Sequence, residues 1–390
     1  MMERTGTNLF RVKEYNQSRV LEIIRTLGPV SRRDIADISG LKFQTVSNIT
    51  NRLRGIGVVV EEPDAVDDGR RRSVKLRVNA EAAYAAGIQL NRASLSVAVT
   101  DFAAEVLVRS SYEIAVSEGP SVVVPMICEK VGKAVEDAGI PEGKVLGAGI
   151  GVPGPARPET GWMLDPGLAG WSEYPLRQEL ERLLGMPVRV DNDATAAAVG
   201  ERWNGIARDV SDFVYVYLGS GVGAGIFVNH QVCRGMGGNG GEIGHISVER
   251  NGPLCYCGNR GCLELYVTPQ GILREARVAA LQTSHLSPEA TVPFPEKIED
   301  VLESDETLFQ SVVETAGERL GGVLANVVSI VDPELVVLGG PTTGLLGERF
   351  KESAVRILRD SAFPRRPLAR VEVSAIGADA GPVGAAALVL

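Results

Sequence analysis

The strongest constraint on this chain is a cluster of three cysteines with one histidine close upstream. Cys255, Cys257 and Cys262 lie within eight residues, and His245 precedes the first of them by ten. One imidazole and three thiolates form a complete tetrahedral ligand set, which is typical of structural zinc. A chance group of buried thiols accounts for neither the histidine nor the two glycines before Cys262. The spacing is not that of a zinc finger, so we predict a structural Zn²⁺ that shapes a loop.

Length and hydropathy define the broad class of protein. The 390 residues favour two or three compact units over one small core. No stretch approaches the roughly 20 consecutive apolar residues of a membrane span, and the first residues lack the apolar segment of a signal peptide. We therefore expect a cytoplasmic protein without a membrane partner, where clustered cysteines favour metal binding or buried thiols over disulfides.

The charge is divided unevenly along the chain. A net charge of −9 argues at first against a nucleic-acid ligand. However, residues 1–80 hold 15 basic against 10 acidic side chains, whereas residues 81–390 hold 25 against 39. A basic head on an acidic body is the pattern expected when one module alone contacts DNA.

Three short helices are predicted near the N-terminus. Apolar residues recur at helical spacing over residues 16–27, Ser31 suits the N-cap of a second helix that ends at Gly40, and a third helix is predicted over residues 42–54. This pattern fits a helix-turn-helix, whose second helix enters the major groove, and fits a three-helix interaction module equally well. For the DNA-binding interpretation, the candidate contacts are Ser31, Arg32, Lys42, Gln44, Thr45, Ser47, Asn48, Asn51 and Arg52.

The segment that follows favours the DNA-binding interpretation. Residues 58–60 are predicted to form a strand, and residues 73–78 alternate in the manner of a second strand. Between them lie Arg70, Arg71 and Arg72, whose charge suits a phosphate backbone or a narrow minor groove. A solvated loop paired with the neighbouring aspartates is the alternative, but its position after a helix-turn-helix indicates a wing.

Beyond residue 79, strands alternate with longer helices, which predicts α/β lobes with helices covering the sheets. Ligands of such folds bind where loops leave the carboxyl ends of strands. The run Asp191–Asp193 follows one predicted strand and opens an alanine-rich helix. The glycine-rich segment 219–223 links two strands, and it fits a phosphate-binding turn or a plain hairpin.

Taken together and in this order, these motifs resemble the ROK family of repressors, open reading frames and sugar kinases. The resemblance rests on Gly-His at 244–245 followed by Cys-x-Cys-Gly-x-x-Gly-Cys-x-Glu at 255–264, and on Gly-Pro-Val-Ser-Arg at 28–32, which is similar to the repressor branch. Repressors of that branch respond to N-acetylglucosamine, glucose or xylose. The resemblance implies a winged helix-turn-helix in residues 1–80 and a two-lobed, actin/hexokinase-like sensing body in residues 81–390.

The resemblance also implies a division of the body and a set of sugar ligands. Lobe one would span about residues 81–191 plus the final helix 381–390, and lobe two about residues 192–380. His245 would use one ring nitrogen for zinc and the other for the sugar, since a metal-bound imidazole has a fixed orientation. The residues that match the family's sugar-binding positions are Asn192, Asp193, Glu242, His245, Glu264 and, in the loop at 151–155, Gly154.

Departures from the family pattern favour a sensor over a kinase. Active relatives open their first strand with Asp-x-Gly-Gly-Thr, whereas this chain has Gln-Leu-Asn-Arg-Ala at 89–93. Gln89 removes a carboxylate that would assist Mg²⁺, and Pro341 offers no N–H to a nucleotide after the late glycine pair. We therefore expect no catalytic residues. Asp193, the base position of a working kinase, is expected to keep a hydrogen-bonding role alone.

The resulting expectation is a non-enzymatic repressor of carbohydrate-utilisation genes. A homodimer, or a tetramer, would bind a palindromic operator and be released by sugar. One alternative is an ATP-dependent sugar kinase with a DNA-binding head. A second is a constitutive DNA-binding protein whose sugar site has decayed, which the retained sugar-binding positions argue against.

Overall fold

The structure is a computed structural model that describes residues 9–63, 74–141, 143–154, 156–157, 160–163, 170–172, 174–283, 298, 307–361 and 369–390. The predicted wing tip with Arg70, Arg71 and Arg72 lies outside the described residues, as does Pro155. None of the described helices is long and apolar enough to cross a bilayer.

The head contains three helices and a small antiparallel sheet of order β1-β3-β2. Its apolar core is built from residues at helical spacing, with Val20, Ile35, Val46 and Leu53 at most 1% exposed. Ser31 caps the second helix through a capping box with Asp34. The elements are α1 (Leu9–Leu27), β1 (Val30–Ser31), α2 (Arg32–Ser39), α3 (Phe43–Gly55), β2 (Val59–Pro63) and β3 (Val74–Val78).

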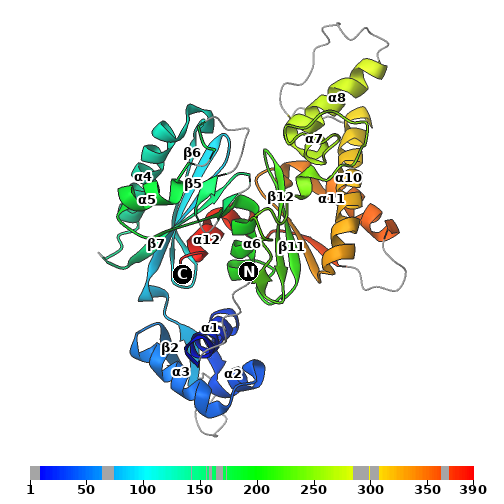
Figure 1. Ribbon diagram of the computed structural model, residues 1–390. Helices are drawn as coiled ribbons and strands as arrows, with labels where there is room; N and C mark the ends of the chain where they lie inside the picture. The colour runs from blue at the N-terminus through cyan, green and yellow to red at the C-terminus, as the bar shows by residue number, and fades with distance from the viewer. Residues whose placement is uncertain are drawn as a thin grey trace, which may run out of the picture.

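The predicted helices and the two strands of the head are therefore confirmed, with two differences. Helix α1 begins at Leu9, earlier than the apolar periodicity indicates, and residues 12–15 within it are exposed and give no signal of a buried face. Strand β1 is too short for a periodicity signal and forms through pairing of Val30 with Leu76. Beyond this head, Figure 1 shows two further lobes that together form the body.

The first lobe is built on a five-stranded sheet of order β10-β7-β4-β5-β6. Helices α4 and α5 cover its outer face, where Ile88, Val97, Ile127 and Leu180 belong to one buried cluster. The elements are η1 (Ala80–Ala82), β4 (Tyr84–Leu90), β5 (Ser94–Asp101), β6 (Val106–Glu113), η2 (Val116–Glu118), α4 (Pro120–Asp137), β7 (Val145–Val152), β8 (Ala156–Arg157), β9 (Trp162–Met163), α5 (Leu176–Leu184) and β10 (Val188–Asn192).

The second lobe is built on a five-stranded sheet of order β13-β12-β11-β14-β15. Alternate residues of β11 enter different cores: Val214 and Val216 pack with α10 and α11, whereas Phe213 and Tyr215 pack with α6. The elements are α6 (Asp193–Asn204), β11 (Phe213–Leu218), β12 (Val222–Val228), β13 (Gln231–Val232), η3 (Ile243–His245), α7 (Glu264–Val267), α8 (Pro269–Thr283), α10 (Thr307–Val331), β14 (Leu335–Gly339), α11 (Thr343–Ser361), β15 (Arg370–Val373), η4 (Gly377–Asp379) and α12 (Ala380–Ala387).

Helices α6 and α12 lie between the two sheets and pack closely against each other (Figure 1). A Cβ on Gly200 of α6 would lie 2.1 Å from the carbonyl oxygen of Ala380, and one on Gly384 would lie 1.7 Å from that of Ala196. Glycine is therefore required where the two backbones meet. Helix α12 also contacts β4 and β7 of the first sheet. The predicted α/β architecture is confirmed, and α6 occupies its centre.

Candidate functional site

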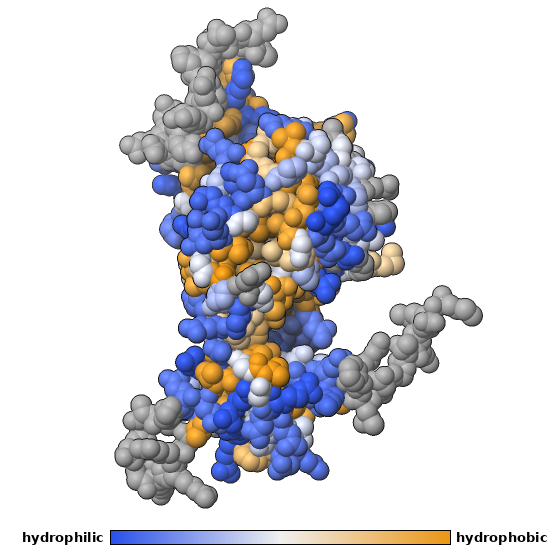
Figure 2. Space-filling model, turned by 90° about the vertical axis from the view of Figure 1, so that its left-hand side faces the viewer, coloured by the Kyte–Doolittle hydropathy of each residue, from blue (hydrophilic) through white to orange (hydrophobic). Residues whose placement is uncertain are grey.

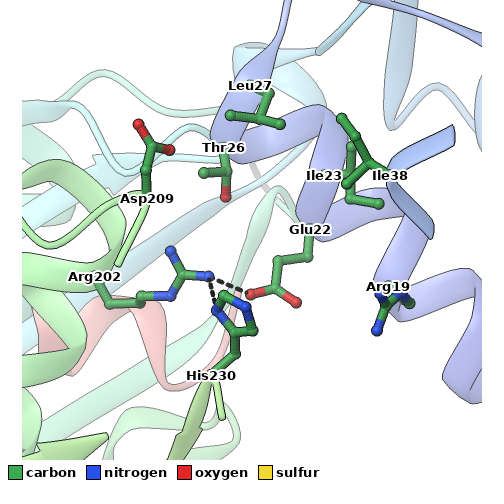
Figure 3. Close-up of a pocket in the computed structure, with 9 residues that line it drawn as sticks. All are labelled: Arg19, Glu22, Ile23, Thr26, Leu27, Ile38, Arg202, Asp209 and His230. Carbon is green, nitrogen blue, oxygen red and sulfur yellow. Dashed lines mark hydrogen bonds and ion pairs between the residues drawn. The ribbon is translucent and has the colours of Figure 1, made fainter. Parts of the chain in front are cut away.

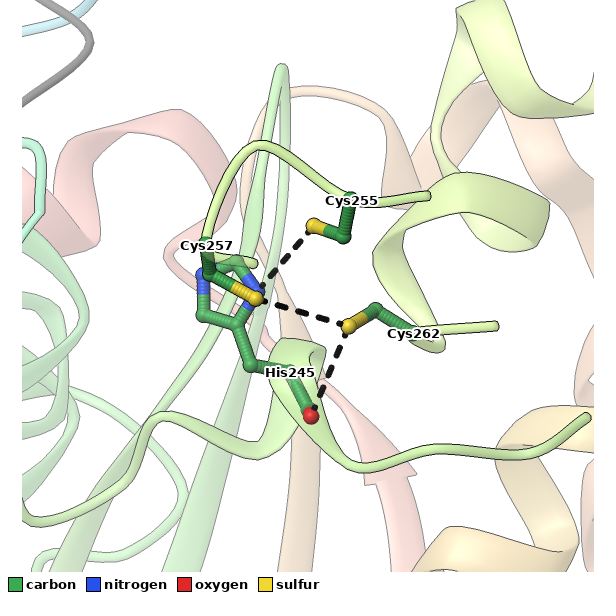
Figure 4. A group of neighbouring side chains, drawn as sticks. All are labelled: His245, Cys255, Cys257 and Cys262. Atoms are coloured by element: carbon green, nitrogen blue, oxygen red, sulfur yellow. Dashed lines mark hydrogen bonds between the residues drawn. The ribbon is translucent and has the colours of Figure 1, made fainter. Parts of the chain in front are cut away.

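The histidine and three cysteines singled out by the sequence converge at one point (Figure 4). Their ligand atoms all lie within 4.8 Å of one another. His245 Nδ1 is 3.6 Å from Cys255 Sγ, and Cys257 Sγ is 3.7 Å from Cys262 Sγ. Sulfur ligands about 2.3 Å from one tetrahedral zinc lie about 3.8 Å apart, so this donor set fits the ion.

Local folding explains how the cluster forms. Gly258 and Gly261 adopt positive φ angles of 90° and 61°, which reverse the chain between the second and third cysteines. Burial raises the pKa of the Cys262 thiol to about 12. A bound metal cation would stabilise the thiolate, so metal binding here would release the proton of this thiol.

The ring of His245 presents its two nitrogens to different surroundings. Nδ1 faces the thiols, whereas Nε2 lies 3.2 Å from the hydroxyl of Tyr256 and 3.9 Å from a carboxylate oxygen of Glu242. This geometry allows one nitrogen to bind metal and the other to bind a second ligand. Sequence reasoning missed Tyr256, which also lies near the Arg92 guanidinium, 5.5 Å from the ring centroid.

Asn192 and Asp193 begin α6 at the end of β10. The Asn192 side-chain oxygen accepts hydrogen bonds from the backbone N–H groups of Ala194 (2.9 Å) and Thr195 (3.1 Å). Its Nδ2 donates to the carbonyl oxygen of Gly154 (3.1 Å). The N-cap therefore fixes Asn192 and joins it to the loop at 151–154, which sequence analysis also assigned to the site.

Glu242 and Glu264 lie close enough to Asp193 to affect its ionisation. Burial, with contributions from the nearby Glu242 and Glu264, raises the pKa of Asp193 to about 7. Glu264 accepts a hydrogen bond from the Val222 backbone N–H (3.0 Å). The polar cluster, defined as Asn192, Asp193, Glu242, His245 and Glu264, thus brings together the five side chains that the sequence nominated. It presents carboxylate acceptors and an imidazole, the groups that a polyhydroxylated ligand needs.

A buried ion pair supports this cluster and was not predicted. Both Nε and Nη2 of Arg234 contact Asp191 Oδ2, at 2.9 and 2.6 Å, and the Asp191 side chain is 4% exposed. Asp191 immediately precedes Asn192, so the pair holds the end of β10 against the segment that leads to Glu242. No motif indicated it, because the partners lie 43 positions apart.

Beside the polar cluster, where the resemblance to the family would place the phosphate loop of a kinase, three polar side chains share hydrogen bonds. Gln89 Nε2 donates to Asn91 Oδ1 (3.5 Å), and the Tyr217 hydroxyl donates to the same oxygen (2.8 Å). Burial raises the pKa of Tyr217, so the phenol stays a neutral donor. Asn91 follows β4 of the first sheet and Tyr217 lies on β11 of the second. Their hydrogen bond therefore joins the two lobes.

The glycine-rich segment 219–223 forms the turn of the β11–β12 hairpin, with Leu218 paired to Val222. The hairpin alternative thus describes its local structure. A Cβ on Gly219 would lie 3.4 Å from Cγ of Pro341, which places the proline ring beside this turn. A residue without a backbone N–H therefore lies where two glycine-rich loops meet.

The predicted DNA-contacting residues divide by exposure. Lys42, Gln44, Asn48, Asn51 and Arg52 are exposed on or beside α3, whereas Thr45 and Ser47 are half-buried. Gln44 Nε2 donates to Asn48 Oδ1 (3.3 Å), as expected for side chains four residues apart on a helix. The exposed polar side chains therefore form a row along one helix face.

Two of the residues predicted to contact DNA, Ser31 and Arg32, make contacts within the head. Arg32 donates to Thr50 Oγ1 (3.1 Å) and to Glu61 (2.8 Å), so its guanidinium braces α2 against α3 and β2. Ser31 caps α2. Phe43, which was not nominated, is 56% exposed at the start of α3, and an exposed aromatic there suits contact with a thymine methyl group.

Known proteins resemble this chain over almost its whole length. The ROK family model matches residues 85–390. The chain is 30% identical over 384 residues to the xylose repressor of Caldicellulosiruptor bescii, covering 97% of this chain and 96% of the relative. It superposes on the crystal structure of a ROK family transcriptional regulator, a homolog of E. coli MLC protein, with a TM-score of 0.79 and 28% identity over 97% of this chain and 96% of that one.

A kinase of the same fold aligns with less of the chain. The ROK family glucokinase from Streptomyces griseus, in complex with glucose and AMPPNP, is 28% identical with a TM-score of 0.68, covering 78% of this chain and 99% of that one. The regulator therefore aligns with almost all of this chain, whereas the complete kinase leaves about a fifth of it unmatched. The chain belongs to the ROK family, in its branch of transcriptional repressors.

Proposed function

We propose that this protein is a sugar-responsive transcriptional repressor, with residues 1–80 as the DNA-binding unit and residues 81–390 as the sensing unit. The observation that carries the proposal is that one chain combines an exposed polar helix in the head with a polar cluster in the body. Beside that cluster, where a kinase would hold phosphate, Asn91 is hydrogen-bonded to Gln89 and Tyr217. Figure 2 shows the head as a separate lobe with a largely hydrophilic surface. Such an arrangement suits a module that meets DNA while the body responds to a ligand.

In this proposal α3 enters the major groove. Gln44, Asn48 and Asn51 carry amides that can read base edges, and Lys42 and Arg52 carry charges for phosphates. Arg70, Arg71 and Arg72 would contact the DNA backbone from the wing. A homodimer would present two such heads to a two-fold operator, spaced by about one helical turn.

The polar cluster would bind the sugar. Asp193, Glu242 and Glu264 would accept hydrogen bonds from hydroxyl groups, and Nε2 of His245 would face the ligand. A zinc ion held by His245, Cys255, Cys257 and Cys262 would fix the imidazole and the loop that carries it. D-xylose is the first candidate effector, because the full-length relative at 30% identity is named a xylose repressor.

The protein would act without catalysis. Gln89 and Asn91 bond to each other and to Tyr217 in the region where a nucleotide phosphate would need backbone N–H groups. Pro341 removes a further N–H beside the glycine turn. Sugar binding would therefore be reported to DNA without conversion to a product.

A sugar kinase with a DNA-binding head is the second candidate, and one observation favours it. The pKa of Asp193 at about 7 suits a general base for a sugar hydroxyl at neutral pH. Coupled measurement of ADP release with D-xylose, D-glucose and N-acetyl-D-glucosamine distinguishes the two functions. We expect no turnover above the background rate, and steady turnover with any of these sugars would establish the kinase.

The repressor function is tested by fluorescence anisotropy. Labelled duplexes from the intergenic DNA beside the gene are titrated with protein, with and without each of the three sugars. We expect salt-sensitive, saturable binding to one duplex, weakened by D-xylose. Binding to no duplex, or binding that no sugar alters, would refute the proposal.

A further inference from the structure

The head contacts the body through α1 and the C-terminal end of α6. Nη2 of Arg202 lies 2.9 Å from Oε1 of Glu22 on α1, and 3.1 Å from Nδ1 of His230 (Figure 3). One residue further along α6, the ring of Trp203 lies 3.9 Å from the guanidinium carbon of Arg25. The helix that begins in the polar cluster therefore ends at the DNA-binding head.

Some of the hydrogen-bond donors in this contact have no partner among the described residues. The Arg202 side chain is 6% exposed, and its Nε and Nη1 are buried without a hydrogen-bond partner among the described residues. Burial, together with the charge of Arg202, lowers the pKa of Arg25 to about 10. Cavities of about 240 and 390 Å³ adjoin the contact. Crowded cations and donors without a protein partner make this contact weaker than a fully paired one, so a ligand could shift it.

Helix α6 is one short, mostly buried helix that would act as a rigid element. It has 12 residues, a length of about 18 Å, and it is buried over Ala194–Arg202. Gly225 of β12 brings the strand against it, since a Cβ there would lie 2.3 Å from that of Ala198. A shift of Asn192 and Asp193 at one end would therefore be carried to Arg202 at the other.

A second segment, residues 230–245, leads from the head back to the polar cluster and contacts the end of α6 and the strand residue that precedes it. His230 meets Arg202 at the head. Four residues later Arg234 pairs with Asp191, directly before the start of α6, and the segment continues to Glu242 and His245 of the polar cluster. Helix α6 and the segment 230–245 thus both connect the polar cluster with the contact at the head.

We propose that α6 and the segment 230–245 carry the state of the polar cluster to the head, and that the Arg202–Glu22–His230 contact is where the two are coupled. The proposal rests on the repressor function and names its regulatory element. Glu22 and Arg202 would bind neither sugar nor DNA, and would act as positioning residues that make each ligand sensitive to the other.

The test compares coupling, defined as the ratio of operator Kd with and without saturating D-xylose, in wild type, Glu22→Gln and Arg202→Gln. Glu14→Gln is the matched control, because it removes the same charge from an exposed position on the same helix. Xylose affinity by calorimetry and operator affinity without sugar report whether each variant's body and head are folded. Glu22 is partly exposed, so Glu22→Gln is the gentler of the two variants.

We expect a wild-type ratio of about 5–150, a typical range for coupled sites. In Glu22→Gln and Arg202→Gln it falls toward 1 while both affinities persist, and Glu14→Gln keeps the wild-type ratio. Wild-type coupling in Glu22→Gln would overturn this link and leave the repressor function intact. A wild-type protein that binds neither operator nor sugar would overturn both.

Discussion

Two neighbouring groups of polar side chains in the body use their polar atoms in different ways. At the polar cluster, Asp193, Glu242 and Glu264 face one another and keep acceptors for a ligand. Beside it, Asn91 accepts hydrogen bonds from Gln89 and from Tyr217. One group thus offers acceptors, whereas the other is engaged in contacts within the protein. In the proposed function, the first group would bind the sugar and the second would stand where a kinase binds phosphate.

The largest effect is expected from removing the metal site. Cys262→Ser, or treatment with a strong chelator, should abolish measurable sugar binding and lower the melting temperature, because metal binding contributes to folding of the loop that carries His245. Calorimetric titration and differential scanning calorimetry measure the two effects. Cys233→Ser, which changes an exposed cysteine outside the cluster, should behave as wild type. Unchanged sugar affinity in Cys262→Ser would show that the cysteine loop does not position the polar cluster.

Asp193→Asn should weaken sugar binding by about 10- to 150-fold, corresponding to loss of a hydrogen bond to a charged group worth about 1.5–3 kcal/mol. Calorimetry measures the affinity. Asp137→Asn, at the exposed end of α4, is the control and should leave it unchanged. Equal affinities for Asp193→Asn and wild type would remove Asp193 from the sugar site.

Stability should depend on pH through the same carboxyl group. Its pKa is raised from 3.8 to about 7, so the folded state binds more protons than the unfolded state between these values. The free energy of unfolding therefore falls as pH rises from about 4 to 7, and the penalty persists above pH 7. Asp193→Asn should be more stable than wild type at pH 8, by on the order of 1 kcal/mol, with the difference lost near pH 4. Urea denaturation at both values measures this, and equal stabilities at pH 8 would contradict it.

The smallest effect is expected for ATP binding after changes at Gln89 and Asn91. Gln89→Asp combined with Asn91→Gly should open the phosphate region and cut the hydrogen bond to Tyr217, yet give little ATP binding while Pro341 stays beside the glycine turn. Equilibrium dialysis with labelled ATP provides the measurement. Substantial ATP affinity in this double variant would show that the two altered residues alone close the site.

The sequence predicted most of the helices and strands but few of the contacts between them. Apolar spacing and capping residues predicted the three helices of the head, since apolar spacing reports which face of a helix is buried. They missed β1, which exists only through its partner strand, and Phe43, whose exposure no local pattern indicates. In the body, the five side chains of the polar cluster were nominated by motif, whereas Arg234 and Tyr256 carried no recognisable signal.

The sequence by itself determined the cluster of His245 and three cysteines, because its side chains and turn glycines lie in one segment of 18 residues and local geometry suffices to bring them together. It also determined the family and the loss of the phosphate motif. Tertiary structure alone decided that α6 runs from the polar cluster to the head, since Arg202 and Glu22 are 180 positions apart and meet only when α1 packs on the body. Long-range contacts of this kind depend on how preformed elements pack, and no short segment encodes them.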